Sequence, residues 1–179
     1  MNQAPAQLID KMGADRFVAP AEREVWRILA DVPDPEIPVL SVVELGIIRH
    51  VRFADSGRVT VGVSPTYTGC PATEVIARSI ETRLEAEGYE HPKVESVLSP
   101  PWSSDWLTES GREKLKEYGI APPAQSVSNV KHLYRDPNVA CPRCSSMQTS
   151  KVSEFASTPC KALYRCSSCL EPFEYFKCI

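Results

Sequence analysis

Three segments of the chain carry apolar residues at the spacing of an α-helix. Prolines, glycines or polar capping residues bound these segments, so each is predicted to form one helix that packs its apolar side on a core. The predicted helices cover residues 19–32, 71–87 and 109–118. The buried stripe of the second helix is expected to contain Ile80, Leu84 and either Val75 or Ile76.

Three other segments alternate between apolar and polar residues, as a β-strand with one buried face does. Residues 47–53 and 58–63 are predicted to form a hairpin, because an Asp-Ser-Gly turn sequence lies between them. Residues 93–98 are predicted to form a third strand. The order helix, strand, strand, helix, strand, helix predicts a two-layer α/β (α+β) domain over residues 20–120.

The character of the sequence changes after residue 120. Residues 121–140 begin with Ala-Pro-Pro and continue with small polar residues, which predicts a linker. Residues 141–179 are rich in cysteine and aromatic residues. The chain is therefore predicted to contain an α/β domain, a linker and a small C-terminal module.

Composition narrows the classes of function. The chain has 179 residues, 42% of them hydrophobic, and a formal net charge of −3, so a globular fold is expected and a nucleic-acid partner is not. The sequence contains no apolar run of the roughly 18–20 residues that span a bilayer, and its start lacks the pattern of a secretory signal. We therefore expect a cytoplasmic protein without a membrane partner, whose thiols are reduced.

Four of the seven cysteines form two C-x-x-C pairs, which are separated by 21 residues. Each pair can direct two thiolates at one ion, and two pairs complete a tetrahedron with Zn–S distances of about 2.3 Å. We predict a structural Zn²⁺ site in a C-terminal zinc ribbon, because about 40 residues have too small a core to fold unaided. Four thiolates also suit iron or an iron–sulfur cluster. The predicted ligands are Cys141, Cys144, Cys166 and Cys169.

Two further cysteines lie in the C-terminal module. Cys160 is six positions before Cys166, so it could fill a small apolar space or approach the metal as an extra or exchanging ligand. Cys178 is one residue from the end and is expected to be exposed. The sequence leaves the role of both cysteines open.

The remaining cysteine, Cys70, lies at the predicted start of the second helix. Pro71 fits the first helical position, which makes Cys70 the N-cap residue. Free backbone N–H groups and the positive end of the helix dipole favour a thiolate there. Gly69 would let a partner approach the sulfur. The alternative is a cysteine that only fills a turn.

A proline-rich turn carries Asp34 and Glu36, in the sequence Asp-Pro-Glu-Ile-Pro. Acidic residues beside prolines are usually solvated turn residues, so on their own they do not indicate a site. The three histidines do not have the spacing of metal ligands. The sequence also contains no glycine-rich phosphate loop and no Ser-His-Asp arrangement.

Two stretches of the chain resemble known families. DPEIPVLSVVELGIIRHV, followed by VSPTYTGCP, resembles the metal–sulfur cluster assembly domain family. PPWSSDWLTESGREKLKEYGIAPP, together with the cysteine module, is similar to the D-subunit family encoded with phenylacetyl-CoA epoxidases. The combined resemblance covers nearly the whole chain from about residue 20. By this resemblance, Cys70 matches the family cysteine, Thr66 and Thr68 lie in its turn, and Asp34 and Glu36 match the DPE element.

The resemblance implies an accessory protein of phenylacetate degradation, not the catalyst itself. Such a protein would assist the insertion of iron or an iron–sulfur cluster into the di-iron oxygenase or the iron–sulfur reductase of the epoxidase. These components are the expected partners, and iron or a cluster would be bound only transiently. Whether the chain forms a homodimer is left open.

Two other functions stay open. The chain could be a structural subunit that remains bound to the oxygenase through its ribbon. It could also be a thiol enzyme with Cys70 as nucleophile, although no histidine lies near Cys70 in the sequence to activate it.

Overall fold

The computed structural model describes residues 19–67, 69–123 and 139–177. The chain divides into two compact units, one that ends at Gly111 and one that begins at Arg112. No helix within the described ranges is both long and apolar enough to cross a membrane.

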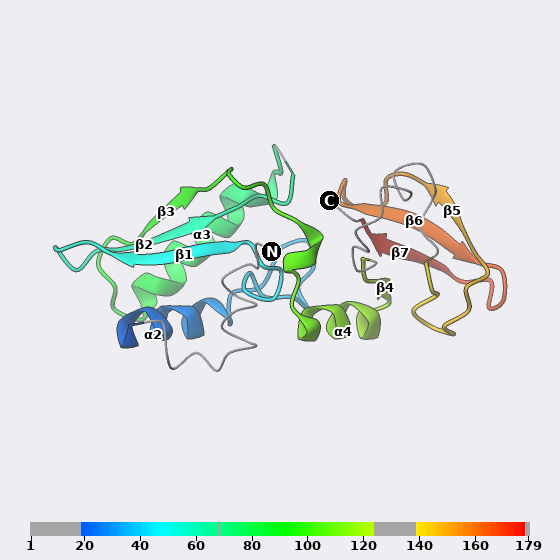
Figure 1. Cartoon of the computed structure of the whole chain (residues 1–179), viewed down its shortest axis with the longest axis horizontal. Helices are drawn as coiled ribbons and strands as arrows, with labels where there is room; N and C mark the ends of the chain where they lie inside the picture. Colours follow the sequence, from blue (N-terminus) through cyan, green and yellow to red (C-terminus); the bar gives the residue numbers. More distant parts are fainter. Residues whose placement is uncertain (1–18, 68, 124–138, 178–179) are drawn as a thin grey trace. The chain divides into compact units, whose positions relative to one another are not determined.

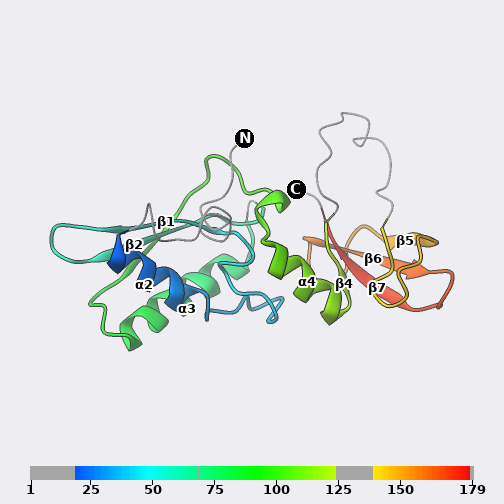
Figure 2. The ribbon, with the colours of Figure 1, turned by 60° about the horizontal axis from the view of Figure 1, so that its bottom comes forward.

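The first unit is a sheet of three strands covered by helices. β1 (Ile48–Phe53) and β2 (Val59–Val63) form an antiparallel hairpin, and β3 (Lys93–Ser96) pairs in parallel with β2, so the sheet order is β1-β2-β3. α2 (Pro20–Leu29) and α3 (Ala72–Ala86) lie on the same face of this sheet, as Figures 1 and 2 show. The predicted mixed α/β class is confirmed. The 3₁₀ helix η1 (Ser104–Trp106) follows, and α4 (Glu109–Tyr118) runs across the boundary between the units.

The core of the first unit forms where the alternating valines of β2 meet the helices. Val61 is fully buried, and Ile80 of α3 is likewise closed to solvent. The structure decides between the two candidates for the helix stripe: Ile76 is buried, whereas Val75 is 51% exposed. Residues four apart lie on one side of a helix, so Ile76 continues the row that contains Ile80 and Leu84.

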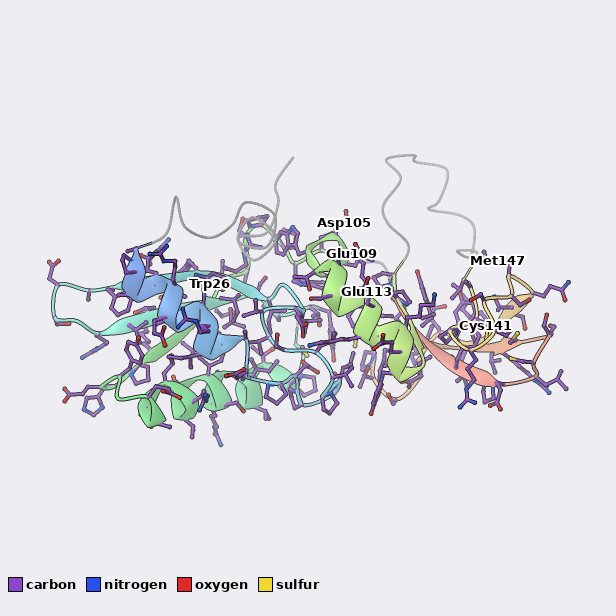
Figure 3. All side chains as sticks on the ribbon, turned by 90° about the horizontal axis from the view of Figure 1, so that it is seen from below. Trp26, Asp105, Glu109, Glu113, Cys141 and Met147 are labelled. Atoms are coloured by element: carbon purple, nitrogen blue, oxygen red, sulfur yellow. The ribbon has the colours of Figure 1, made fainter. Side chains whose placement is uncertain are left out.

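α4 has the bounds that the sequence predicts for the third helix, because residues directly beside it begin and end it. The Thr108 hydroxyl accepts a hydrogen bond from the Gly111 N–H at 3.1 Å, as an N-cap residue does. Gly119, with φ of +94°, ends the helix in the left-handed region that glycine adopts without strain. Figure 3 shows Glu109 and Glu113 on α4, and both residues are exposed.

The segment before α4 is fastened to the loop that precedes β1. The Trp102 indole N–H donates to the Leu45 carbonyl at 3.1 Å. Gly46 packs so closely that a Cβ atom there would lie 2.3 Å from the Trp106 carbonyl oxygen, and its φ is +73°. A side chain at residue 46 would therefore push η1 away from the sheet.

The second unit contains a four-stranded ribbon sheet with the order β4-β7-β6-β5. Aromatic rings fill its small core, where Tyr164 packs on Phe173 and Tyr175 with ring centroids 5.9 and 5.5 Å apart. The strands are β4 (Ile120–Ala121), β5 (Thr149–Ser153), β6 (Lys161–Cys166) and β7 (Pro172–Phe176).

Residues at both ends of the predicted linker belong to the ribbon sheet or to its core. Ile120 and Ala121 form β4, which pairs in parallel with β7, so the sheet of the second unit begins before the predicted linker. At the other end of the predicted linker, Val139 is buried in the ribbon core. This pairing joins residues far apart in sequence and leaves no local pattern. Residues 124–138 of the predicted linker lie outside the described residues.

We predict that Ile76→Ala destabilises the protein by about 2–5 kcal/mol, because it opens a cavity in the core under α3. Val75→Ala is the matched control on the adjacent, exposed position and should change the free energy of unfolding by less than about 0.5 kcal/mol. Denaturant unfolding of both variants measures the difference. Equal effects of the two substitutions would show that the helix is rotated from the orientation described.

We also propose that the first unit folds without the ribbon. A chain that ends at Gly119 keeps α4 and its cap but lacks all four ribbon strands. We expect circular dichroism to show helix and a cooperative thermal transition, because the sheet and its helices have a core of their own. A soluble chain of this length without such a transition would contradict the proposal.

Candidate metal centre and thiol site

The sulfur atoms of the four predicted ligands converge at one end of the ribbon. The Sγ atoms of Cys141 and Cys169 are 3.7 Å apart, those of Cys144 and Cys166 are 3.6 Å apart, and all four lie within 4.8 Å of one another. A tetrahedral zinc with Zn–S distances of about 2.3 Å requires sulfurs separated by about 3.8 Å. The donor set and its spacing therefore fit a tetrahedral zinc ion.

The two C-x-x-C turns repeat one backbone arrangement. In each turn the N–H of the first cysteine donates to the carbonyl five residues later, at 3.0 Å: Cys141 to Ser146, and Cys166 to Glu171. In each, the residue after the second cysteine has a positive φ, 59° at Ser145 and 64° at Leu170. Non-glycine residues seldom adopt this conformation, so its repetition indicates that both turns are shaped for the same ligand geometry.

The sulfurs differ in how readily they lose their protons: a backbone hydrogen bond at Ser146 lowers the pKa of Cys144, but burial and the other three sulfurs outweigh it and raise this pKa to about 12. The Cys169 N–H donates to the Cys166 sulfur at 3.5 Å, and this bond is the largest of the causes that together lower the pKa of Cys166 to about 6. A backbone hydrogen bond at Glu171 lowers the pKa of Cys169, but burial and the neighbouring sulfurs outweigh it, so the net shift is upward. A bound cation would remove this conflict, since metal ligation favours thiolates at all four positions.

A pair of serine hydroxyls joins the two turns beside the sulfurs. Ser146 and Ser168 lie 2.7 Å apart through their Oγ atoms, and the Ser167 N–H donates to the Gln148 carbonyl at 2.7 Å. Figure 3 shows Cys141, in the first turn, and Met147, just beyond it. These contacts help to hold the two turns side by side at the sulfur cluster.

Cys160 is not one of the converging sulfurs. It is buried and directly precedes β6, whereas Cys166 is the last residue of that strand. Six residues of extended strand separate two atoms by roughly 20 Å, so of the two roles left open for Cys160 the structure favours the small buried residue over the extra ligand. The sulfur of Cys160 instead lies 3.0 Å from the Thr158 hydroxyl. Cys178 lies outside the described residues.

Cys70 is half-buried and lies between the end of β2 and the start of α3. Its position differs by one residue from the prediction, because α3 begins at Ala72 and Pro71 occupies the N-cap position. The Cys70 carbonyl accepts a hydrogen bond from the Thr73 N–H at 3.2 Å, and no side chain caps this helix end. The thiol therefore lies one residue before the helix cap, on a short exposed turn.

The residues around Cys70 are partly as predicted. Gly69 is exposed and has φ of +82°, with no atom within 4 Å of the place of a Cβ, so glycine is needed for the backbone conformation. Thr66 is half-buried in the same turn. Thr68 lies outside the described residues.

Asp34 is buried and organises its own turn, so the expectation of a solvated turn residue is wrong for this carboxylate. Its Oδ1 accepts hydrogen bonds from the Glu36 N–H at 2.9 Å and the Ile37 N–H at 2.7 Å. This is the capping behaviour typical of aspartate, and the Asp-Pro-Glu sequence could have suggested it. Glu36 is half-buried. A direct role of either carboxylate beside Cys70 stays a prediction.

The described ranges contain one convergent set of three or more cysteine, histidine or carboxylate ligands, and it is the ribbon set. Cys70, Asp34 and Glu36 are all described, and they do not form a second such set. Cys70 therefore offers a single thiol, not a preassembled metal site.

Two family descriptions match separate parts of the chain. Residues 22–98 match a family described as iron–sulfur cluster assembly protein. Residues 125–177 match a family described as the PaaD zinc beta ribbon domain. The first range contains Cys70, and the second contains the four converging cysteines.

A protein of Escherichia coli K12, provisionally named as the D subunit of 1,2-phenylacetyl-CoA epoxidase, is 49% identical over 160 residues, which cover 89% of this chain and 94% of the relative. The chain belongs to the family of this epoxidase subunit. A Porphyromonas gingivalis protein named Fe-S protein maturation auxiliary factor is 34% identical over 95 residues, which cover 52% of this chain and 90% of the relative. The crystal structure of a DUF59 domain from Bacillus anthracis is 24% identical over 52% of this chain and 90% of its own, with a TM-score of 0.49.

We predict that the purified protein contains about one zinc ion per chain. Cys169→Ser should release this zinc and unfold residues 139–177 locally, because the aromatic core alone is too small to hold the ribbon. Elemental analysis and proteolysis of the ribbon measure the two effects.

Cys160→Ser is the matched control for the loss of one thiol. It should retain the zinc, since residue 160 lies outside the sulfur cluster and the Thr158 hydroxyl can bond the new hydroxyl. Iron in place of zinc would overturn the choice of metal. Zinc retained at full stoichiometry by Cys169→Ser would overturn the four-thiolate site.

Proposed function

We propose that this chain is a cytoplasmic accessory factor that assists the insertion of iron or an iron–sulfur cluster into a component of phenylacetyl-CoA epoxidase. The observation that carries the proposal is the union of two matches in one chain. The part that bears Cys70 matches an iron–sulfur cluster assembly family, and the chain over 89% of its length is similar to an epoxidase subunit. A chain that combines an iron–sulfur assembly domain with similarity to an epoxidase subunit is suited to serve the epoxidase alone.

The surroundings of Cys70 support a transient role for its thiol. A carrier must bind its metal and then release it, so it should contribute few fixed ligands. Cys70 lies on an exposed turn and is not part of a preassembled ligand set among the described residues. In this proposal the donor and receiving proteins supply the other ligands, and Thr66, Thr68, Asp34 and Glu36 shape the surroundings of the thiol.

The ribbon has a different part in the proposal. Its four thiolates hold one Zn²⁺ that leaves no open coordination position, so the zinc is structural. The metal keeps the two turns in place and lets a small module present a rigid surface. We propose no catalytic step by this chain.

The receiving partner is proposed to be the iron–sulfur reductase or the di-iron oxygenase of the epoxidase. Both need a metal centre that must be inserted after synthesis. The match to an iron–sulfur assembly family favours the reductase, because the reductase is the component with an iron–sulfur cluster. The similarity to an epoxidase subunit does not distinguish between the two components.

A second function, that of a permanently bound structural subunit, is favoured by one observation. Of the seven large apolar side chains exposed among the described residues, four lie on the ribbon: Met147, Val152, Phe155 and Leu170. Exposed apolar side chains on a small rigid module suit docking to another protein. In this alternative the surface is required and the Cys70 sulfur is not.

We predict that Cys70→Ala leaves the fold and the zinc content unchanged but abolishes maturation. Epoxidase components produced in cells with this variant should be present in normal amounts and poor in iron or labile sulfide. The half-buried thiol makes few packing contacts that alanine would lose, so stability should change by less than about 1 kcal/mol. The measurements are metal and sulfide content of each component, and epoxidase activity.

Cys160→Ser again serves as the control, since it removes a thiol from the ribbon without touching the assembly domain. Cells with this variant should contain fully metallated epoxidase. If Cys70→Ala also supports full metallation and activity, the carrier role is refuted and the structural role is the better account. Co-purification of the chain with the epoxidase in a fixed ratio would then be expected.

A further inference from the structure

The first unit contains an arginine, Arg49, with two buried N–H donor atoms that lack a hydrogen-bond partner among the described residues. The Nε and Nη1 atoms of Arg49 are closed to solvent and have no hydrogen-bond partner among the described residues. The guanidinium lies on the ring of Trp106, with its central carbon 3.8 Å from the ring centroid. Burial lowers the pKa of Arg49, and no carboxylate among the described residues forms an ion pair with it.

A second unsatisfied group lies on the neighbouring strand. The Oγ of Ser64 is buried and likewise has no hydrogen-bond partner in the described part of the chain, and the residue is only 1% exposed. Its backbone N–H donates to the Ile47 carbonyl at 2.8 Å, which extends the β1–β2 hairpin by one residue pair. Ser64 therefore lies beside the strand that carries Arg49.

The strand register places the two side chains on the same face of the sheet. Ile48 pairs with Val63 and His50 pairs with Gly62, so Arg49 is the extra residue of a β-bulge. Ile48 faces the helices and is fully buried, and Arg49, the next residue, faces the other way. Ser64 shares that second face, because Val63 faces the helices with Ile48.

Unpaired buried groups of this kind are costly. A buried hydrogen-bonding group without a partner destabilises the folded chain, and a charged one does so more strongly. The cation–π stack on Trp106 offsets part of this cost but supplies no hydrogen-bond acceptor. A guanidinium and a hydroxyl on one face both donate hydrogen bonds, so the missing partner is an acceptor with negative charge.

We propose that Arg49 and Ser64 form a binding site for a small oxyanion on the sheet face opposite α2 and α3. The oxyanion accepts hydrogen bonds from the guanidinium and the hydroxyl, and Trp106 closes the site. Because the donor atoms are covered, the anion enters when η1 moves away from β1. The site is separate from the ribbon and does not depend on the accessory role of the chain.

The experiment titrates the full chain with inorganic phosphate in one arm and acetate in the other. Isothermal titration calorimetry gives the stoichiometry, and thermal unfolding gives the stabilisation that binding to the folded state must produce. One site per chain is expected for one of the two anions. Stronger binding of phosphate would identify a tetrahedral oxyanion group, and stronger binding of acetate would identify a carboxylate.

Two variants and one control make the test specific. Arg49→Met should abolish binding, and Ser64→Ala should weaken it about tenfold, which is the effect of one hydrogen bond to a charged group. Arg52→Met is the matched control, because Arg52 is an exposed arginine of the same strand and should leave binding unchanged. Without added anion, Arg49→Met should be at least as stable as the natural chain, since it removes a charge whose inner donors are buried and unpaired.

Three results would overturn the proposal. The first is that neither anion binds the natural chain, which would mean that ordered water satisfies the two groups. The second is that Arg52→Met weakens binding as much as Arg49→Met does, which would mean that the anion binds through general surface charge. The third is that Ser64→Ala folds and binds the anion as tightly as the natural chain does. This variant also decides the matter if Arg49→Met does not fold.

Discussion

The ribbon depends on the convergence of four sulfur atoms from two turns that lie far apart in the sequence. Its core is a few aromatic rings on a four-stranded sheet, and a module of this size cannot offset its conformational entropy by burial alone. The backbone of both turns is shaped in the same way, with a residue of positive φ directly after the second cysteine. This strain is tolerated because it aims the sulfurs at one point. Metal ligation, sheet pairing and the fixed turn geometry are therefore one cooperative unit.

The first unit is built on a different principle: its described residues contain no convergent set of metal ligands, and Cys70 lies on a turn outside its core. Burial of the valines of β2 against α3 holds the end of β2 and the start of α3 in place. The turn that carries Cys70 connects these two elements. A thiol on such a turn has a defined position without a fixed set of co-ligands. This contrast separates the two kinds of cysteine in the chain: the four ribbon sulfurs converge on one point, whereas Cys70 is a single thiol on a turn, as the proposed transient role requires.

The first unit also shows how distant segments are tied to its sheet. The segment before α4 returns to the start of β1 through the Trp102 indole and through the close approach of Gly46 to Trp106. That approach places an aromatic ring over Arg49 and closes the second face of the sheet at this point. A fold that needed only stability would fill this position with an apolar side chain. The retained charge is therefore the best indication in the first unit of a ligand beyond the thiol chemistry.

The sequence by itself determined the features that depend on neighbouring residues. The helices, the hairpin turn, the Thr108 cap and the two C-x-x-C turns follow from local spacing, because their hydrogen bonds join residues within a few positions. Only the tertiary structure decided features that depend on pairing across the chain. It placed β4 in the ribbon sheet and Cys160 at the far end of β6 from the metal ligands, and it buried Asp34. It also brought Arg49, Ser64 and Trp106 together, since strand register and loop packing are set by the whole core and leave no periodic trace in the sequence.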